Sequence, residues 1–485
     1  MKTKLNISSQ AATIILIVCS LMLPAQIILG VSPHPQLQDK IVSNPNAAPR
    51  FQAELDDRHD RGICVGNDDY FRRFLKKRAE EATRAAGLNG APPLGQFRIL
   101  AILVQFSDKA ASTASTYFDS MMFSNSGPTV WDYYDEVSGS QIDLVTVNQP
   151  SSLGWHTAPS TLAYYTNGAY GTGSYPQNSQ KLVEDLVDQI DPLVNFTNYD
   201  NDSNGYVDVL LVIHSGTGAE FSSDVNDFWS HQWGIAPRLK DGVYISSFTV
   251  QPEYWVSSGD MTIGVYAHEL AHGFGLPDLY DTDYSSKGIG KWGLMSGGSW
   301  NGTGIGGNFP AWPSAYCRSK MGVETPTNIT SNVTGQSITA ATSGGGILRV
   351  WSSGAIGDEY FLIENRQKAG YDAYLPSEGL LIWHVDESIA GSNSDEWYPG
   401  QPAASHFKVA LEQADGLFNL EHNSGNGDAG DVFPGSSSNS TFGSASLPSS
   451  DSYLSGATTV SVSNISSSGT VMTADLSVGL ALSTD

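Results

Sequence analysis

Residues 265–281, VYAHELAHGFGLPDLYD, carry the side chains best suited to chemistry. His268 and His272 are four positions apart, so on a helix both imidazoles project from one face and can reach the same metal ion. Glu269 follows the first histidine and can reach a water on that metal. Zinc lowers the pKa of such a water toward about 7, and a carboxylate can accept its proton as the oxygen attacks a carbonyl. The spacing predicts a hydrolytic zinc site with Glu269 as general acid/base.

The residues after this helix can supply a third ligand, which a catalytic zinc site usually needs. Gly275, three positions after the second histidine, suits a left-handed turn that ends the helix, and Pro277 stiffens the returning chain before Asp278. The extended pattern HExxHxxGxxD favours zinc over two histidines packed by chance in a core. Asp278 is the expected third ligand, with Glu364 and Asp281 as alternatives.

A methionine in a Gly/Ser-rich turn follows the motif. Met295 lies in KWGLMSGGSW, residues 291–300, and resembles the methionine turn that forms a hydrophobic floor under the zinc of metzincins. A lone buried methionine is ordinarily core, but the position downstream of the motif favours this structural role. Metzincins often carry a tyrosine just after this methionine. Ser296 and Gly297 follow here, which leaves His231 and Tyr280 as weaker candidates for polarising the substrate carbonyl.

The pattern of apolar residues predicts two different domains. Residues 95–328 alternate buried-strand patterns, such as FRILAILVQF and VDVLLVIHSG, with a helix near residues 182–190, which predicts an α/β (α+β) catalytic domain. Residues 329–485 are rich in Ser, Thr and Gly and contain short strand patterns such as YFLIEN, GLLIWHV and VMTADLSV. They predict an all-β, sandwich-like C-terminal domain.

The N-terminal residues have the patterns of a signal peptide and a propeptide. Residues 1–30, with Lys2 and Lys4 before an apolar stretch, predict a signal peptide, the alternative being a retained membrane anchor. Residues 31–94 predict a propeptide, with a basic helix at 68–86 and a Gly/Pro-rich linker at 87–95. We therefore expect a secreted, extracellular protein with no stable membrane insertion after the signal is removed.

The charge of the chain limits its expected binding partners, and its cysteine content limits its expected disulfides. The chain of 485 residues holds 25 Lys or Arg and 50 Asp or Glu, a formal net charge of −25. Such an acidic chain repels nucleic acid and anionic lipid. Its 3 cysteines, one of them in the predicted signal, are too few for a disulfide framework.

With these motifs together, the chain resembles the immune inhibitor A family of secreted zinc metallopeptidases, which is metzincin-like. The resemblance rests on ILAILVQFSD, DYYDEVSGSQIDL, HELAHGFGLPDLYD and GLMSGGSWNG, and on YFLIENRQ, GLLIWHVDE and GDAGDVFPG in the β region. It implies an endopeptidase with zinc on His268, His272 and Asp278, Glu269 as acid/base, and proteins or peptides as substrates.

A second metal site is expected at DNDSNGYVD, residues 200–208. Oxygen ligands at Asp200, Asp202, Asn204 and Asp208 surround Gly205, an arrangement that suits calcium. Position 12 of an EF-hand loop would fall on Leu211, so the loop is not a complete EF-hand. The alternative is a solvated acidic turn.

Latency is expected from the propeptide acting as inhibitor. Cys64 is its only cysteine, and a thiolate there could occupy the open position of the zinc and keep the precursor latent. A disulfide with Cys317, an idle thiol, or the same role for Asp68 or Asp69 are the alternatives.

The function expected from the sequence is that of a secreted zinc endopeptidase, made as a latent zymogen, in which Glu269 assists attack by a zinc-bound water on a peptide bond. Two rivals stay open. One is an exported adhesion or carbohydrate-binding protein with a vestigial zinc site, against which the intact Glu269 argues. The other is a zinc hydrolase of a nonpeptide amide or ester.

Overall fold

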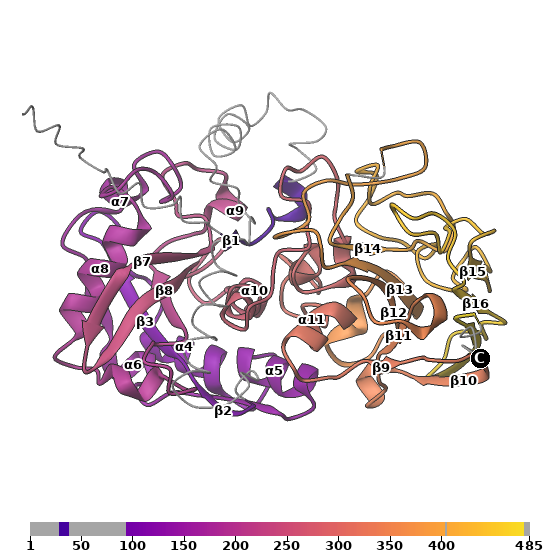
Figure 1. Ribbon diagram of the computed structural model, residues 1–485. Helices are drawn as coiled ribbons and strands as arrows, with labels where there is room; N and C mark the ends of the chain where they lie inside the picture. The colour runs from indigo at the N-terminus through magenta and orange to yellow at the C-terminus, as the bar shows by residue number, and fades with distance from the viewer. Residues whose placement is uncertain (1–28, 38–93, 403–404, 480–485) are drawn as a thin grey trace, which may run out of the picture.

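The computed structural model describes residues 29–37, 94–402 and 405–479. They form a mixed α/β structure with several sheets (Figure 1). The N-terminal α/β region lies on the left in that view, the C-terminal β region on the right, and helix α10 between them. Within these ranges, no helix combines the length and apolar character that crossing a membrane requires. Most of the signal peptide predicted at 1–30 and most of the propeptide predicted at 31–94 lie outside these ranges.

A six-stranded sheet organises the N-terminal region, in the order β1-β7-β8-β6-β3-β5. Strands β3, β5, β6 and β8 run parallel, and β7 and β1 are antiparallel to their neighbours. Their bounds are β1 Leu29–Gly30, β3 Leu100–Gln105, β5 Trp155–Thr157, β6 Leu210–His214, β7 His231–Lys240 and β8 Val243–Pro252. A separate parallel pair joins β2 Gly95–Arg98 to β4 Ile142–Val145.

Two hydrophobic cores cover the two faces of this sheet. Successive residues of a strand point to opposite faces, so Leu100 and Ile102 of β3 pack in one core while Ala101 and Leu103 pack in the other. Helix α8 Ser179–Ile190 covers the first face, and α5 Val130–Ser138 and α10 Ile263–Gly273 cover the second. The HExxH motif is therefore carried by a helix that is held directly on the sheet.

Side chains cap the first turns of some of these helices. Thr129 and Asn178 accept hydrogen bonds from the first turns of α5 and α8, and Gly139 ends α5 in a left-handed conformation. The remaining helices of the N-terminal region and its border are α4 Ser115–Phe123, α6 Pro150–Leu153, α7 Leu162–Thr166, α9 Ala219–Ser222 and α11 Ala315–Lys320.

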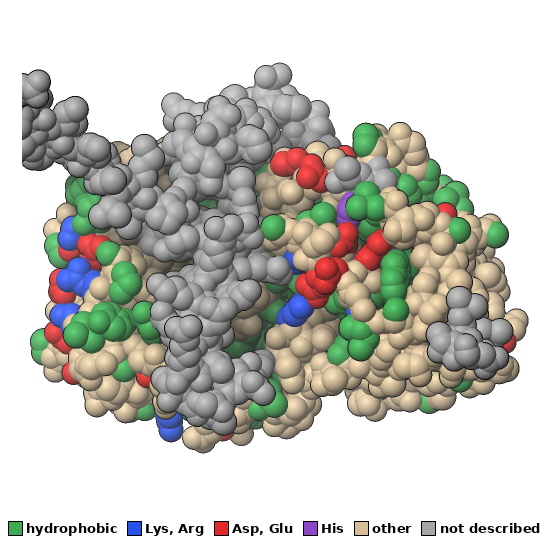
Figure 2. All heavy atoms as spheres, viewed as in Figure 1, with side chains coloured by type: hydrophobic (Ala, Val, Ile, Leu, Met, Phe, Trp, Pro, Cys, Tyr) green, Lys and Arg blue, Asp and Glu red, His purple; other side chains and the backbone are tan. Residues whose placement is uncertain are grey.

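The C-terminal region contains two antiparallel-rich sheets. One has the order β14-β13-β12-β11-β9 and the other β10-β17-β16-β15, and a third hydrophobic core draws residues from both. Acidic side chains gather on its visible face (Figure 2). The strands are β9 Thr327–Asn328, β10 Val333–Thr339, β11 Leu348–Val350, β12 Glu359–Arg366, β13 Gly379–Asp386, β14 Val409–Leu411, β15 Phe442–Gly443, β16 Ser461–Ser463 and β17 Val471–Ser477.

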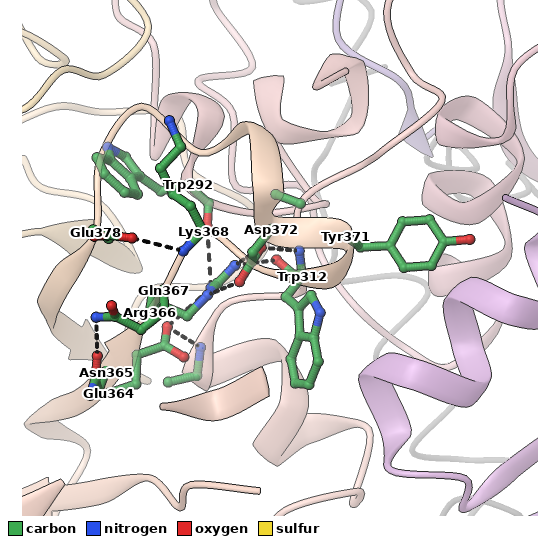
Figure 3. A network of polar contacts seen from close by, with 12 residues as sticks. Trp292, Trp312, Glu364, Asn365, Arg366, Gln367, Lys368, Tyr371, Asp372 and Glu378 are labelled. Atoms are coloured by element: carbon green, nitrogen blue, oxygen red, sulfur yellow. Dashed lines mark hydrogen bonds and ion pairs between the residues drawn. The ribbon is translucent and has the colours of Figure 1, made fainter. Parts of the chain in front are cut away.

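The two regions share buried contacts across residue 328. The core that contains α10 also includes Leu362, Trp383 and Leu411 of the C-terminal strands. A buried ion network lies beside it (Figure 3): the Arg366 guanidinium binds the Asp372 carboxylate through Nε and Nη2, at 2.5 and 2.6 Å. Packing therefore makes the C-terminal region part of the support for the N-terminal one.

Candidate metal centre

Helix α10 presents its functional residues in a fully buried setting. His268, Glu269 and His272 all have 0% exposed surface. Gly275 follows with φ of +81°, in the left-handed region, and its amide donates to the His272 carbonyl at 2.9 Å. The amide of Leu276 then donates to Ala271 O at 3.2 Å, so the helix closes and the chain turns back.

The returning chain brings Asp278 to the two histidines. Its Oδ1 lies 3.0 Å from His268 Nε2 and 3.5 Å from His272 Nε2. Ligands held about 2.0–2.1 Å from a tetrahedral zinc ion lie roughly 3.3 Å from one another, so these separations fit a shared ion. The three side chains form one of the two groups, within the described ranges, whose geometry could hold a metal.

Backbone carbonyls fix the tautomer of both rings. His268 Nδ1 lies 3.0 Å from Leu294 O, and His272 Nδ1 lies 2.8 Å from Leu276 O. Because a carbonyl oxygen only accepts, each Nδ1 carries the proton and each Nε2 keeps its lone pair. Both lone pairs face Asp278, as metal-ligating imidazoles with outer hydrogen bonds do.

The converging atoms have no hydrogen-bond partners within the described part of the chain. They are His268 Nε2, His272 Nε2 and both carboxylate oxygens of Asp278, together with Glu269 Oε2. Burying such acceptors without a donor costs free energy. A divalent cation would satisfy them, so the donor set fits the metal that the motif predicts.

The methionine turn supports this centre through its backbone. Met295 is fully buried, and its carbonyl accepts hydrogen bonds from Leu279 N at 2.7 Å and Tyr280 N at 3.2 Å. The preceding carbonyl, of Leu294, holds the His268 ring. The turn therefore positions one imidazole and the segment that carries Asp278.

Burial controls the titration of the central groups. It raises the pKa of Glu269 well above its usual value, and the nearby Asp278 and Glu220 carboxylates add to the rise. It lowers the pKa of His272 to about 4. A neutral imidazole and a carboxyl group with a high proton affinity suit metal ligation and proton transfer, respectively.

The alternative third ligands are engaged elsewhere. Glu364 accepts hydrogen bonds from Arg318 Nη1 at 2.7 Å and Trp383 Nε1 at 2.8 Å. Asp281 accepts from Ser286 N at 2.8 Å.

The two candidates for polarising a carbonyl are also buried. Both ring nitrogens of His231 are engaged, Nδ1 with Trp229 O at 2.6 Å and Nε2 with Ser179 Oγ at 2.8 Å. Tyr280 stacks on Tyr284 at 5.9 Å between ring centroids. Neither contact points to a catalytic role.

The expected calcium loop lies between the short helix Phe196–Tyr199 and β6. Asp200, Asp202 and Asp208 offer carboxylate oxygens within 4.8 Å of one another. The Asn204 amide group donates to Asp202 Oδ2 at 2.7 Å, and Gly205 has φ of +85°. Burial raises the pKa of Asp200, and Asp202 raises it further, a crowding of negative charge that a cation would relieve.

The latency candidate Cys64 lies outside the described ranges, as do Asp68 and Asp69. Cys317, the alternative disulfide partner, is buried and is a free thiol in the structure.

Sequence reasoning missed several groups around Glu269. The Val31 amide donates to Glu269 Oε1 at 2.9 Å from 238 positions away in the chain. Glu220 is fully buried and accepts from Ser230 Oγ at 2.5 Å, and burial raises its pKa to about 7. Neither residue lies in a motif, so only the folded chain reveals them.

Comparison with known proteins identifies this region. The model of the immune inhibitor A peptidase M6 catalytic domain matches residues 95–325. These residues are therefore similar to the catalytic domain of the immune inhibitor A peptidase family. The M6 domain contains α10, Asp278 and Met295, and the match confirms the resemblance inferred from the motifs.

Two curated relatives are similar to part of this chain. The pre-pro-metalloprotease PrtV of Vibrio cholerae is 28% identical over 253 residues, which cover 43% of this chain and 26% of PrtV. Immune inhibitor A of Bacillus thuringiensis subsp. alesti is 33% identical over 211 residues, covering 38% of this chain and 30% of that protein. The match thus spans less than a third of either relative.

Proposed function

We propose that this protein is a zinc-dependent endopeptidase that cleaves protein substrates. The observation that carries the proposal is the convergence of two buried imidazole lone pairs and the Asp278 carboxylate beside Glu269, with no hydrogen-bond donor of the described chain to satisfy them. The similarity of residues 95–325 to a peptidase family, and relatives named as a metalloprotease and as immune inhibitor A, support it.

Each residue has a distinct role in this proposal. His268, His272 and Asp278 hold the ion, and the carbonyls of Leu294 and Leu276 keep both Nε2 atoms turned toward it. Bound zinc supplies a Lewis acid that acidifies water and polarises a carbonyl oxygen. Glu269 accepts a proton at Oε2 and returns it to the leaving amine, a transfer for which its raised pKa is suited.

The remaining sequence inferences complete the proposal. Residues 95–328 form a metzincin-like catalytic domain in which the Met295 turn would provide the hydrophobic floor of the metal site, followed by a β-sandwich at 329–485. Both C-terminal sheets contribute to one core, which supports the sandwich. The chain is exported by a signal at 1–30 and kept latent by a propeptide at 31–94, in keeping with the prepro form in the printed name of PrtV.

Hydrolysis of casein by the processed protein tests this function. We expect activity that a zinc chelator abolishes and added zinc restores, with about one zinc per chain by elemental analysis. Activity that persists with the metal removed would contradict the proposal. Hydrolysis of esters or nonpeptide amides alone would favour the rival hydrolase, and no hydrolysis at all would favour an adhesion role.

Asp278→Ala tests the third ligand. Because a catalytic zinc site depends on three protein ligands, we expect zinc affinity to fall by at least about a hundredfold in a competition assay with a chromophoric chelator. Asp281→Asn is the matched control, since this carboxylate caps a local turn, and should bind zinc as the parent does. Equal zinc affinity of Asp278→Ala and the parent would rule out this assignment.

Calcium at residues 200–208 is proposed as a structural cofactor. A cation bound only by the native state stabilises it by about 2.7 kcal/mol at 100 times its Kd. We therefore expect calcium to raise the melting temperature relative to a calcium-chelated sample, and Asp202→Asn with Asp208→Asn to remove that rise. A melting temperature insensitive to calcium would leave the loop as a solvated acidic turn.

A further inference from the structure

A short N-terminal segment lies over the candidate centre. Residues 29–37, here called the N-terminal strap, run beside α9 in Figure 1. Leu29 and Gly30 pair antiparallel with Gln232 and His231 of β7, where they add a strand to the end of the six-stranded sheet. The strap is thus bound as extended peptides are bound by the edge of a sheet.

The strap next reaches the catalytic carboxylate. The Val31 amide donates to Glu269 Oε1 at 2.9 Å, and Val31 has 0% exposed surface. Two indole groups bind the adjoining carbonyls: Trp229 Nε1 donates to Val31 O at 2.9 Å, and Trp300 Nε1 donates to Ser32 O at 3.0 Å. All these contacts recognise the main chain, which any substrate peptide also carries.

Two side chains anchor the strap beyond the carboxylate. The His34 ring lies edge-to-face with Phe221 and Trp300, at centroid distances of 5.3 and 4.9 Å, and its Nε2 donates to Ile305 O at 2.8 Å. Leu37 is 5% exposed and packs in an aromatic cluster with Tyr170, Trp229, Tyr280 and Tyr284.

Prolines prepare the strap for this arrangement. Pro33 and Pro35 flank His34, and their rings fix φ, so less backbone freedom is lost on docking. Gln36 between the anchors points away and is exposed.

From these contacts we propose that the N-terminal strap blocks the Glu269 site in the precursor, with His34 and Leu37 as its anchors. Leu29 and Gly30 occupy the edge of β7 in the uncleaved chain. Residues 31–37, which stay after a signal at 1–30 is removed, hold the hydrogen-bonding position at Glu269 Oε1, so strap and substrate compete for one surface. This assigns the block to residues 29–37 rather than to Cys64. The inference rests on the proposed function, because it concerns access to that site.

The test uses the full precursor with His34→Ala and Leu37→Ala combined, and Gln36→Ala as the matched control. Hydrogen–deuterium exchange should show slow exchange at Val31 and at the start of β7 in the parent and in Gln36→Ala. In the double variant, exchange should be at least tenfold faster at these positions, while the exchange rates of α8 should be unchanged. It should also cleave a fluorogenic peptide before any processing, whereas the parent and the control should not.

Each result decides the proposal. Fast exchange of the parent strap, or a freed strap in a precursor that stays inactive while the processed enzyme is active, would overturn it and leave the proposed function intact. Inactive processed enzyme would instead contradict the proposed function.

If the double variant does not fold, a labelled peptide of residues 29–37 is added to processed parent protein and its binding is followed by fluorescence anisotropy. Replacing the histidine and leucine by alanine should weaken binding at least about tenfold, since burying a leucine alone is worth that factor. Equal binding of the two peptides would overturn the anchoring. This readout is independent of activity.

Discussion

Glu269→Gln is expected to lower kcat for peptide hydrolysis by about 10²–10⁴-fold, the range that a positioned general acid/base contributes. The amide keeps the size of the side chain, but it cannot take up a proton. The measurement is the steady-state rate of the processed variant against parent protein, with zinc content determined on the same samples.

The zinc content separates a chemical effect from a structural one. Because the proposed ligands are His268, His272 and Asp278, the variant should bind zinc as the parent does. Glu378→Gln is the matched control, since Glu378 is an exposed carboxylate of the C-terminal region. A Glu269→Gln enzyme with full activity would exclude Glu269 as the general acid/base.

Arg366→Met is expected to destabilise the protein by about 3–5 kcal/mol, the cost of leaving a buried charge without its partner. Arg366 and Asp372 both have 0% exposed surface. Asp372 Oδ1 also accepts from Trp312 N at 2.9 Å, so the pair ties β12 to the loop before α11. The midpoint of urea unfolding, followed by far-ultraviolet circular dichroism, measures the loss.

The neighbouring Glu364 belongs to the same network. Burial alone would raise its pKa, yet Arg318 and Arg366 hold the pKa of Glu364 below its usual value. Removing Arg366 therefore weakens the compensation of two carboxylates, Glu364 and Asp372.

Two comparisons sharpen this prediction. Arg238→Met removes a partly exposed cation that pairs with Asp188, and should cost at most about 1 kcal/mol. Arg366→Met combined with Asp372→Leu removes both charges, and should recover part of the loss because no buried charge is left unpaired. Similar unfolding midpoints for Arg366→Met and Arg238→Met would contradict the argument.

Local patterns in the sequence account for much of the fold. Continuous apolar runs predicted β3 and β6, and the short strand patterns after residue 330 predicted β12, β13 and β17. The helix expected near residues 182–190 is α8, a helix of 12 residues with a clear apolar face. These elements were predictable because the pattern of apolar residues along each segment reflects its burial.

The hairpin of β7 and β8 was not predicted from the sequence. Strand β7 reads HQWGIAPRLK, where a proline, a glycine and a mostly solvent-facing second half hide the strand pattern. Its pairing with β8 shifts register between Gly234 and Arg238, which local alternation does not anticipate.

The candidate centre was likewise predictable from the sequence only in part. The HExxHxxGxxD spacing pointed to His268, His272 and Asp278, which the fold brings together. The contact of Val31 with Glu269 and the carbonyls of Leu294 and Met295 carry no sequence signal, because any residue supplies a backbone amide or carbonyl. Such partners depend on tertiary contacts.

The turn at Leu294 and Met295 also makes the centre a thermodynamically coupled unit. One carbonyl orients the His268 ring, and the next carries the amides of Leu279 and Tyr280 beside Asp278. A cation that holds these two ligands in place would stabilise the turn between them. By reciprocity, an ordered turn would raise the affinity of the site for the cation. Binding of the ion and local order at this turn would therefore be coupled equilibria, and a substitution that shifts one would shift the other.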